Sequence, residues 1–128
     1  MINGISSNLQ ALSAFATSQA ATANNLANVN TDGYQSARVT LETGQGGTGV
    51  AVQEISRDQT PGPVRYEELP VETADGRTEG EWTAVEGSNV DLSTQMVHMI
   101  NDENAYSANL ASIRTQDELV GSILNMIA

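Results

Sequence analysis

The sequence predicts a mainly α-helical protein with a small β region. Two long helices with heptad patterning occupy the ends of the chain, and we expect them to pair as an antiparallel, coiled-coil-like hairpin with a short β-hairpin and loop insertion between them. Apolar side chains recur at alternating steps of three and four in both terminal segments. All three prolines and most of the glycines lie between these segments. The length of 128 residues fits one structural unit divided at 1–33, 34–87 and 88–128.

The N-terminal segment predicts a helix from about Ser6 to Asn28. Its seam consists of Ile5, Leu9, Leu12, Ala16, Gln19, Ala23 and Leu26. Alanine is abundant and proline is absent, so helix propensity agrees with the spacing. The helix should end before Thr31-Asp32-Gly33, with Gly33 as the left-handed residue.

The middle segment, residues 34–87, predicts short strands and loops. Val39 and Leu41 alternate with polar residues, as do Val50 and Val52, and the glycines of 44–49 favour a hairpin connection between them. We expect the acidic stretch of residues 67–81 to be a loop that Trp82 anchors.

The C-terminal segment continues the heptad spacing without a break over residues 92–127. Its seam consists of Leu92, Met96, Met99, Glu103, Tyr106, Leu110, Ile113, Asp117, Val120, Leu124 and Ile127. Either Ser88 or Asp91 can cap this helix. At 1.5 Å per residue it would be about 54 Å long, against about 35 Å for the first helix. About 20 Å of apolar stripe would lack a partner in the chain, which favours copies of the protein or related subunits as partners.

The charge distribution excludes several classes of function. Sixteen acidic residues against five arginines and no lysine give a net charge of −11. This charge disfavours binding to nucleic acids and anionic membrane surfaces, which bind through Lys and Arg. Residues 1–31 carry no charge, but polar residues interrupt them too often for a membrane span, and they lack the pattern of a cleaved secretory signal.

No catalytic, metal, cofactor or small-molecule site is predicted. His98 has no second His or Cys with which to bind a metal, and a solvated helix position explains it. The glycine-rich loop at 44–49 lacks the lysine of a phosphate-binding loop. A hydrolase that uses Glu67 or Glu68 is a remote alternative, because no activating partner accompanies them. We therefore expect no enzyme.

Two segments resemble the signatures of bacterial flagellar rod and hook axial proteins. The first runs from Ala23 to Tyr34, and the second begins at Glu86. The matching motif positions are Asn24, Asn25, Leu26, Ala27, Asn28, Thr31, Gly33, Tyr34, Gly87, Asn89, Val90, Asp91, Tyr106 and Asn109. Both signatures occur in the order and at the ends that this family shows.

The resemblance implies a structural subunit of the flagellar basal-body rod, the axial drive shaft of the motor. Its partners would be other rod subunits, copies of itself and the type III export apparatus. It would lie in the periplasmic rod and be exported without a cleaved signal peptide. Residues 49–55, with Asp58 and Pro61, are similar to the proximal rod type, FlgC. Residues 86–91 are closer to distal rod and hook types, which remain an alternative.

We expect the helix seams to form the assembly interface. Its residues would be Ile5, Leu9, Leu12, Leu26, Leu92, Met96, Met99, Tyr106, Leu110, Ile113, Val120, Leu124 and Ile127. An alternative from another class is a soluble helical adaptor that binds one partner helix through the C-terminal stripe.

Overall fold

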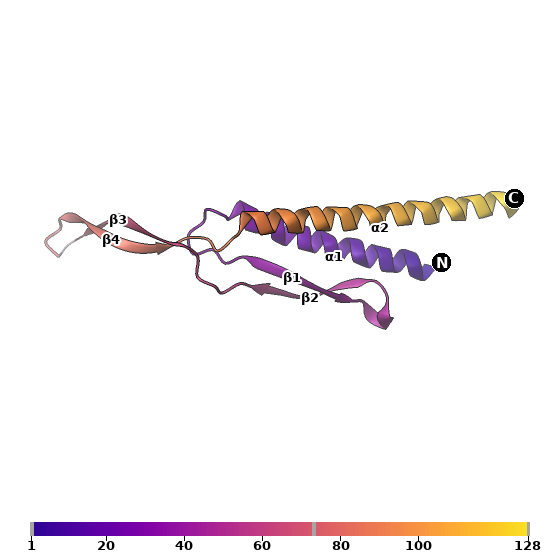
Figure 1. Ribbon diagram of the computed structural model, residues 1–128, viewed down its shortest axis with the longest axis horizontal. Coiled ribbons are helices and arrows are strands. Elements are labelled where there is room, and N and C mark those ends of the chain that lie inside the picture. Colours follow the sequence, from indigo (N-terminus) through magenta and orange to yellow (C-terminus); the bar gives the residue numbers. More distant parts are fainter. Residues whose placement is uncertain (1, 73, 128) are drawn as a thin grey trace.

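The computed structural model describes residues 2–72 and 74–127, in which two helices flank two β-hairpins. In chain order the elements are α1 (Ile2–Ala27), β1 (Ala37–Thr43), the short turn η1 (Gln45–Gly47), β2 (Val50–Arg57), β3 (Val64–Glu72), β4 (Thr78–Glu86) and α2 (Leu92–Ile127). The predicted layout of two terminal helices around a small antiparallel β region is therefore confirmed (Figure 1).

The two helices lie side by side and run in opposite directions. Asn8 donates a hydrogen bond to the Ser112 hydroxyl over 3.2 Å, and Asn25 donates one to the Gln95 side chain over 2.9 Å. A Cβ atom added to Gly4 would lie 3.3 Å from the Gln116 amide nitrogen. The C-terminal end of α2 extends past the described start of α1 (Figure 1).

The polar contacts that join the helices are rotated by one position from the predicted seam. They involve residues 4, 8 and 25 of α1 and residues 95, 112 and 116 of α2, each one position before a seam residue. One position is about 100° around a helix. Seam residues also face the partner helix, since Ile5 and Val120 line one apolar pocket between α1 and α2.

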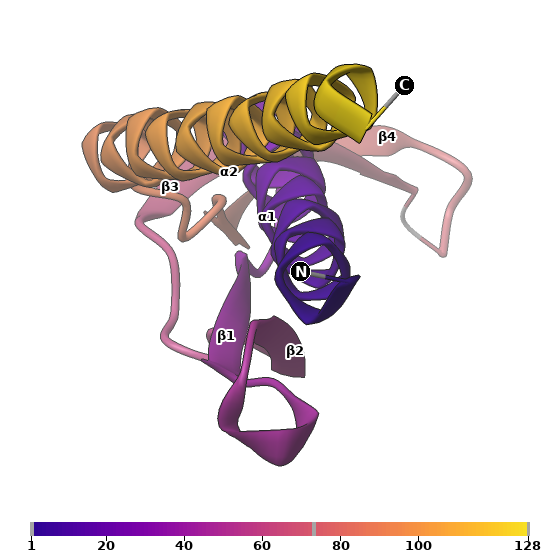
Figure 2. The same cartoon turned by 90° about the vertical axis from the view of Figure 1, so that its right-hand side faces the viewer.

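The small core explains this rotation. The buried apolar residues are Ala11 and Ala14, and the buried polar side chains are those of Thr22, Asn25 and Ser88. Helix α1 lies between α2 and the β1–β2 hairpin (Figure 2), so both of its packed faces carry small side chains that allow close approach. Of the larger apolar side chains of α1, Leu9 is exposed, whereas Ile5, Leu12, Phe15 and Leu26 are half-buried.

The β1–β2 hairpin predicted from the alternating apolar residues is present, and it packs along α1. Ala37 pairs with Arg57 and Thr43 with Val50, with an irregularity between Thr40 and Leu41 that leaves Gln53 without a direct partner. The glycine-rich connection contains three residues with positive φ, Gly46, Gly47 and Gly49, a conformation that glycine adopts at little cost.

The predicted acidic loop at residues 67–81 is wrong. Most of these residues form the β3–β4 hairpin, in which Val64 pairs with Glu86 and Glu72 with Thr78. Pro70 is compatible with a strand here because a two-stranded sheet leaves one edge of each strand without hydrogen-bond partners. Trp82 is 66% exposed, so its predicted anchoring role is also wrong. The hairpin projects beyond the helices along the long axis (Figure 1).

Candidate assembly interface

Asn25 joins three elements at the centre of the molecule. Its side chain is fully buried. The amide nitrogen donates to the Ala37 carbonyl over 2.7 Å and to Gln95 over 2.9 Å. The amide oxygen accepts the Ala37 N–H over 2.8 Å and the Tyr34 hydroxyl over 3.1 Å. Both halves of the amide are thus satisfied, and one side chain connects α1 to the first residue of β1 and to α2.

The residues after Asn25 end α1 and turn the chain. The Asn28 side chain donates to the Asn24 carbonyl over 2.9 Å, and the Thr31 hydroxyl donates to Asn28 over 3.2 Å. Gly33 has φ of 64°, which confirms the predicted left-handed residue, and its N–H donates to the Glu86 carbonyl over 2.8 Å. The Tyr34 hydroxyl returns to Asn24 over 2.9 Å and so closes the turn against the helix.

Asn89 performs a similar task in the second motif. Its side-chain oxygen accepts the Ser36 N–H over 2.7 Å, while its nitrogen donates to the carbonyls of Asp58 and Thr60 over 2.8 and 2.9 Å. The backbone N–H of Asn89 donates to the Tyr34 carbonyl over 3.2 Å. The two motifs, far apart in sequence, therefore form one hydrogen-bonded junction.

Asp91 caps α2, which decides between the two predicted caps. Its carboxylate accepts the Thr94 hydroxyl over 2.7 Å and the Ser93 N–H over 3.0 Å. These hydrogen bonds lower the pKa of Asp91 below its ordinary value of 3.8, and the bond from Thr94 has the larger effect, followed by the bond from Ser93. Ser88 instead accepts the Val90 N–H over 3.2 Å.

A close backbone approach to the second motif explains Gly62. Gly87 donates to the Pro63 carbonyl over 2.8 Å, and a Cβ atom on Gly62 would collide with the Gly87 carbonyl. The two crossing segments can therefore touch only where side chains are absent.

An ion pair connects the β3–β4 hairpin to this junction. Arg65 donates to both oxygens of Asp32 over 2.7 and 2.8 Å and to Glu67 over 2.6 Å. The hydrogen bonds from Asp32 and then Glu67 raise the pKa of Arg65 above its ordinary value. The sequence did not predict this pair, since Asp32 and Arg65 are 33 positions apart and no local pattern links them.

The other motif positions lie outside the hydrogen-bonded junction. Leu26 and Val90 are half-buried beside it, and Ala27 is exposed. Tyr106 and Asn109 lie further along α2, where Asn109 donates to the Ala105 carbonyl over 2.8 Å. Sequence reasoning also missed Gln95, which lies one position before the predicted seam.

The proposed interface residues fall into two groups by exposure. Ile5, Leu12, Leu26, Met99, Tyr106, Leu110 and Ile113 are half-buried. Leu9, Leu92, Met96, Val120, Leu124 and Ile127 are exposed. None of the described residues of α2 is buried. The seams are thus available for contacts outside the chain.

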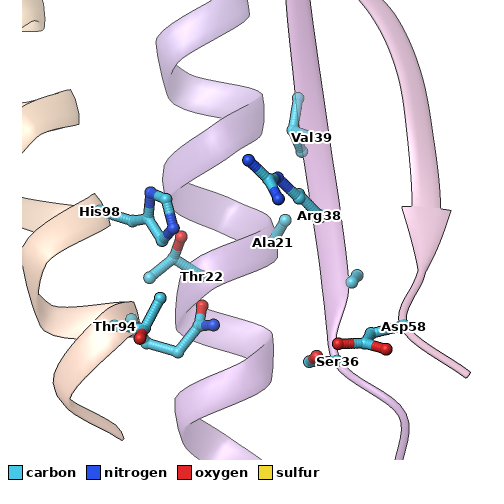
Figure 3. A pocket seen from close by; sticks show the side chains of 10 residues that line it. Ala21, Thr22, Ser36, Arg38, Val39, Asp58, Thr94 and His98 are labelled. Atoms are coloured by element: carbon cyan, nitrogen blue, oxygen red, sulfur yellow. The ribbon is translucent and has the colours of Figure 1, made fainter. Parts of the chain in front are cut away.

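The structure provides little for chemistry on a small molecule. A cleft of about 220 Å³ lies between α1, β1 and α2, with Arg38, Asp58, Thr94 and His98 around it (Figure 3). Residues 2–72 and 74–127 contain no cluster of three or more potential metal ligands. Within the same part of the chain, neither helix combines the length and apolar character needed to cross a membrane.

Comparison with known proteins finds family matches at both ends of the chain. The family model described as "Flagella basal body rod protein" matches residues 5–35, and "Flagellar basal body rod FlgEFG protein C-terminal" matches residues 83–126. Both matches support the rod and hook family of flagellar axial proteins. Proteins of this family are structural, so the prediction that the chain is not an enzyme is confirmed.

Curated members of the family share one segment with this chain. The flagellar hook protein FlgE of Escherichia coli K12 and that of Salmonella typhimurium LT2 are each 42% identical to it over 43 residues. The match covers 34% of this chain and only 11% of the length of each hook protein. Rod and hook family members are axial components that assemble with one another.

Proposed function

We propose that this protein is a structural subunit of the flagellar basal-body rod that assembles through its terminal helices. The observation that carries the proposal is the exposure of the apolar seams after the two helices have paired. Leu9 is 55% exposed and Leu124 63% exposed. An isolated chain would hold these rows in water, whereas neighbouring helices can bury them at a gain of about 25 cal/mol per Å² of apolar surface.

The short middle region supports the rod subtype over a larger axial subunit. Only the two hairpins and their connections, residues 28–91, separate the helices, and the β1–β2 hairpin packs along α1. We therefore keep the proximal rod type, FlgC, as the finer assignment. Under this assignment the protein would lie in the periplasmic rod and would be exported through the type III apparatus without cleavage of a signal peptide.

Substituting exposed seam residues tests this proposal. Leu9→Ser combined with Leu124→Ser should leave the unfolding midpoint of the monomer almost unchanged, since neither side chain is buried. The same variant should fail to restore motility and rod assembly in a strain that lacks the gene. Ile55→Ser is the matched control, because Ile55 is 56% exposed but lies on β2, away from the seams. Normal basal bodies with the double variant would refute the proposal.

A hook-type subunit is the second candidate, favoured by the identity to FlgE. Fractionation distinguishes the two: a rod subunit should remain with purified basal bodies after the hook is removed, whereas a hook subunit should be lost with it. A soluble adaptor would instead form a complex of fixed stoichiometry and no tubular assembly.

A further inference from the structure

The β3–β4 hairpin presents an apolar face that the chain itself does not cover. Cross-strand pairs place Tyr66 opposite Ala84 and Glu68 opposite Trp82, so these side chains share one face with Val64. Val64 is 57% exposed, Tyr66 69% and Trp82 66%. The extensive contacts of β3 and β4 are with each other, and the hairpin points away from both helices (Figure 1).

Such a face indicates a protein partner. An isolated two-stranded hairpin is marginally stable in water, so this one should gain from being covered. Trp and Tyr are the residues that most often dominate the energy of an interface. The charge of the hairpin restricts the chemistry of the partner, because residues 64–86 contain seven carboxylates against two arginines. A single positively charged side chain on the partner would therefore be favoured opposite Glu68.

The cleft between α1, β1 and α2 has the complementary chemistry. The Arg38 side chain makes no hydrogen bond or ion pair with the part of the chain that the structure describes, and it extends toward His98 across the cleft (Figure 3). The one carboxylate there, Asp58, already accepts the N–H and hydroxyl of Thr60. The cleft has a volume of about 220 Å³ and is open to solvent, so a side chain of a partner can enter it.

We propose that the Trp82 face of one copy docks into the Arg38–His98 cleft of a second copy. Trp82 would stack against the Arg38 guanidinium, which binds aromatic faces well. Glu68, whose carboxyl group lies over Gly80 on the same face, would supply the counter-charge to Arg38. This contact rests on the proposed function, because it connects subunits of one axial assembly.

The size of the hairpin limits what this contact can do alone. Nine residues at about 3.3 Å each and two strands about 5 Å apart give a face of about 30 by 10 Å. The contact would bury about 600 Å² over both partners, against about 1,200 Å² or more for a stable complex. It therefore adds to the helix contacts in an assembly and does not produce a stable dimer.

Photocrosslinking from position 82 tests the contact directly. The full chain carries p-benzoyl-phenylalanine in place of Trp82, which keeps a large aromatic side chain, and light and ¹⁵N-labelled copies are mixed at high concentration. We expect adducts between a light and a heavy chain within residues 36–39 or 94–98. Adducts confined to one chain, adducts elsewhere, or none above the level with the probe at Leu69 on the opposite face would overturn the proposal.

Charge exchange tests the ionic part of the contact. Glu68→Arg and Arg38→Glu should each lower the yield of the position-82 cross-link roughly five-fold, the effect of about 1 kcal/mol, and the double exchange should restore it. Arg57→Glu is the control, since Arg57 faces the other side of the β1–β2 hairpin by its register. Failure of the double exchange to restore the yield would overturn the pairing of Glu68 with Arg38.

The cross-linking experiment and the seam variant test the two proposals separately. A normal cross-link together with normal basal bodies in Leu9→Ser/Leu124→Ser would refute the proposed function alone. Lost assembly in that variant without any cross-link to the cleft would refute the hairpin contact alone.

Discussion

Replacement of Asn25 by Ala tests how far the junction depends on one buried amide. The change removes four hydrogen bonds at once, two of them to the backbone of Ala37. The Tyr34 hydroxyl keeps its second partner, Asn24, and the half-buried Gln95 can turn toward water. The N–H and C=O of Ala37 have no such substitute.

The expected loss of stability follows from these two backbone groups. An unsatisfied buried donor or acceptor costs about 1–3 kcal/mol. The Asn25→Ala variant should thus lose about 3 kcal/mol, a large fraction of the 5–15 kcal/mol typical of a domain. Asn24→Ala is the matched control: its side chain is exposed, so we expect a loss of about 1 kcal/mol or less.

Urea unfolding followed by the helical signal at 222 nm measures both losses. Hydrogen exchange at the Ala37 amide provides a local readout, because the substitution removes the acceptor of that proton. If Asn25→Ala were no more destabilising than Asn24→Ala, the junction would not depend on the buried amide, and the role assigned to the first motif would be wrong.

Four further outcomes follow from the geometry. Gly33→Val should destabilise the protein and impair assembly, because φ of 64° is strained for a β-branched residue even though the space around an added Cβ atom is open. Circular dichroism measures the loss of stability, and sedimentation measures the loss of assembly. Because the pKa of Asp91 is lower in the folded chain than its ordinary value, the ionised carboxylate stabilises α2 fully above pH 3.8, and this contribution should be lost as the pH falls through the folded-state pKa. An NMR titration of the first turn of α2 should show the loss, and Asp91→Asn should abolish the pH dependence there. Asp102→Leu should raise monomer stability by about 1–2 kcal/mol in urea unfolding, because Asp102 Oδ2 is buried without a hydrogen-bond partner. Residues 119–127 of α2 should exchange amide hydrogens fastest within that helix in the monomer, and strong protection there at low concentration would contradict the proposed role of the exposed seam.

The period of the helices could be predicted from the sequence, but not which face each helix turns inward. Leu12 and Leu26 mark an apolar row and are half-buried, whereas the fully buried side chain is Asn25, one position before Leu26. A hydrophobic pattern reports which side chains avoid water in the final assembly. It does not distinguish a partner in the same chain from one in a neighbouring subunit.

The β3–β4 hairpin was missed for a related reason. Its strands carry Glu67, Glu68 and Pro70 and bury almost nothing in the monomer, so neither composition nor a buried stripe identifies them. The strands are instead held by cross-strand pairing and by the Arg65–Asp32 ion pair. Long-range contacts of this kind leave no periodic signal in a single sequence.

The candidate site was predicted as a motif but not as a geometry. Asn25, Gly33, Asn89 and Asp91 were all identified from the resemblance, and the turn at Gly33 was predicted from its local chemistry. The sequence could not show that the amides of Asn25 and Asn89 are each used by partners on several elements. That role depends on which segments cross, and this is decided only in the folded chain.

The polar row of α2 explains why the two acidic residues on the predicted seam are tolerated. Glu103 and Asp117 are exposed, while the preceding residues, Asp102 and Gln116, belong to a row that recurs every seven residues. This row consists of Gln95, Asp102, Asn109 and Gln116. It begins and ends at contacts with α1, and two of its oxygen atoms lack partners. Polar groups at heptad positions fix register at a cost in stability. We therefore expect the polar row to make the pairing within the chain specific rather than strong. Under the proposed function, the exposed apolar residues of α2 would be covered by neighbouring subunits, so that assembly completes a core that folding leaves unfinished.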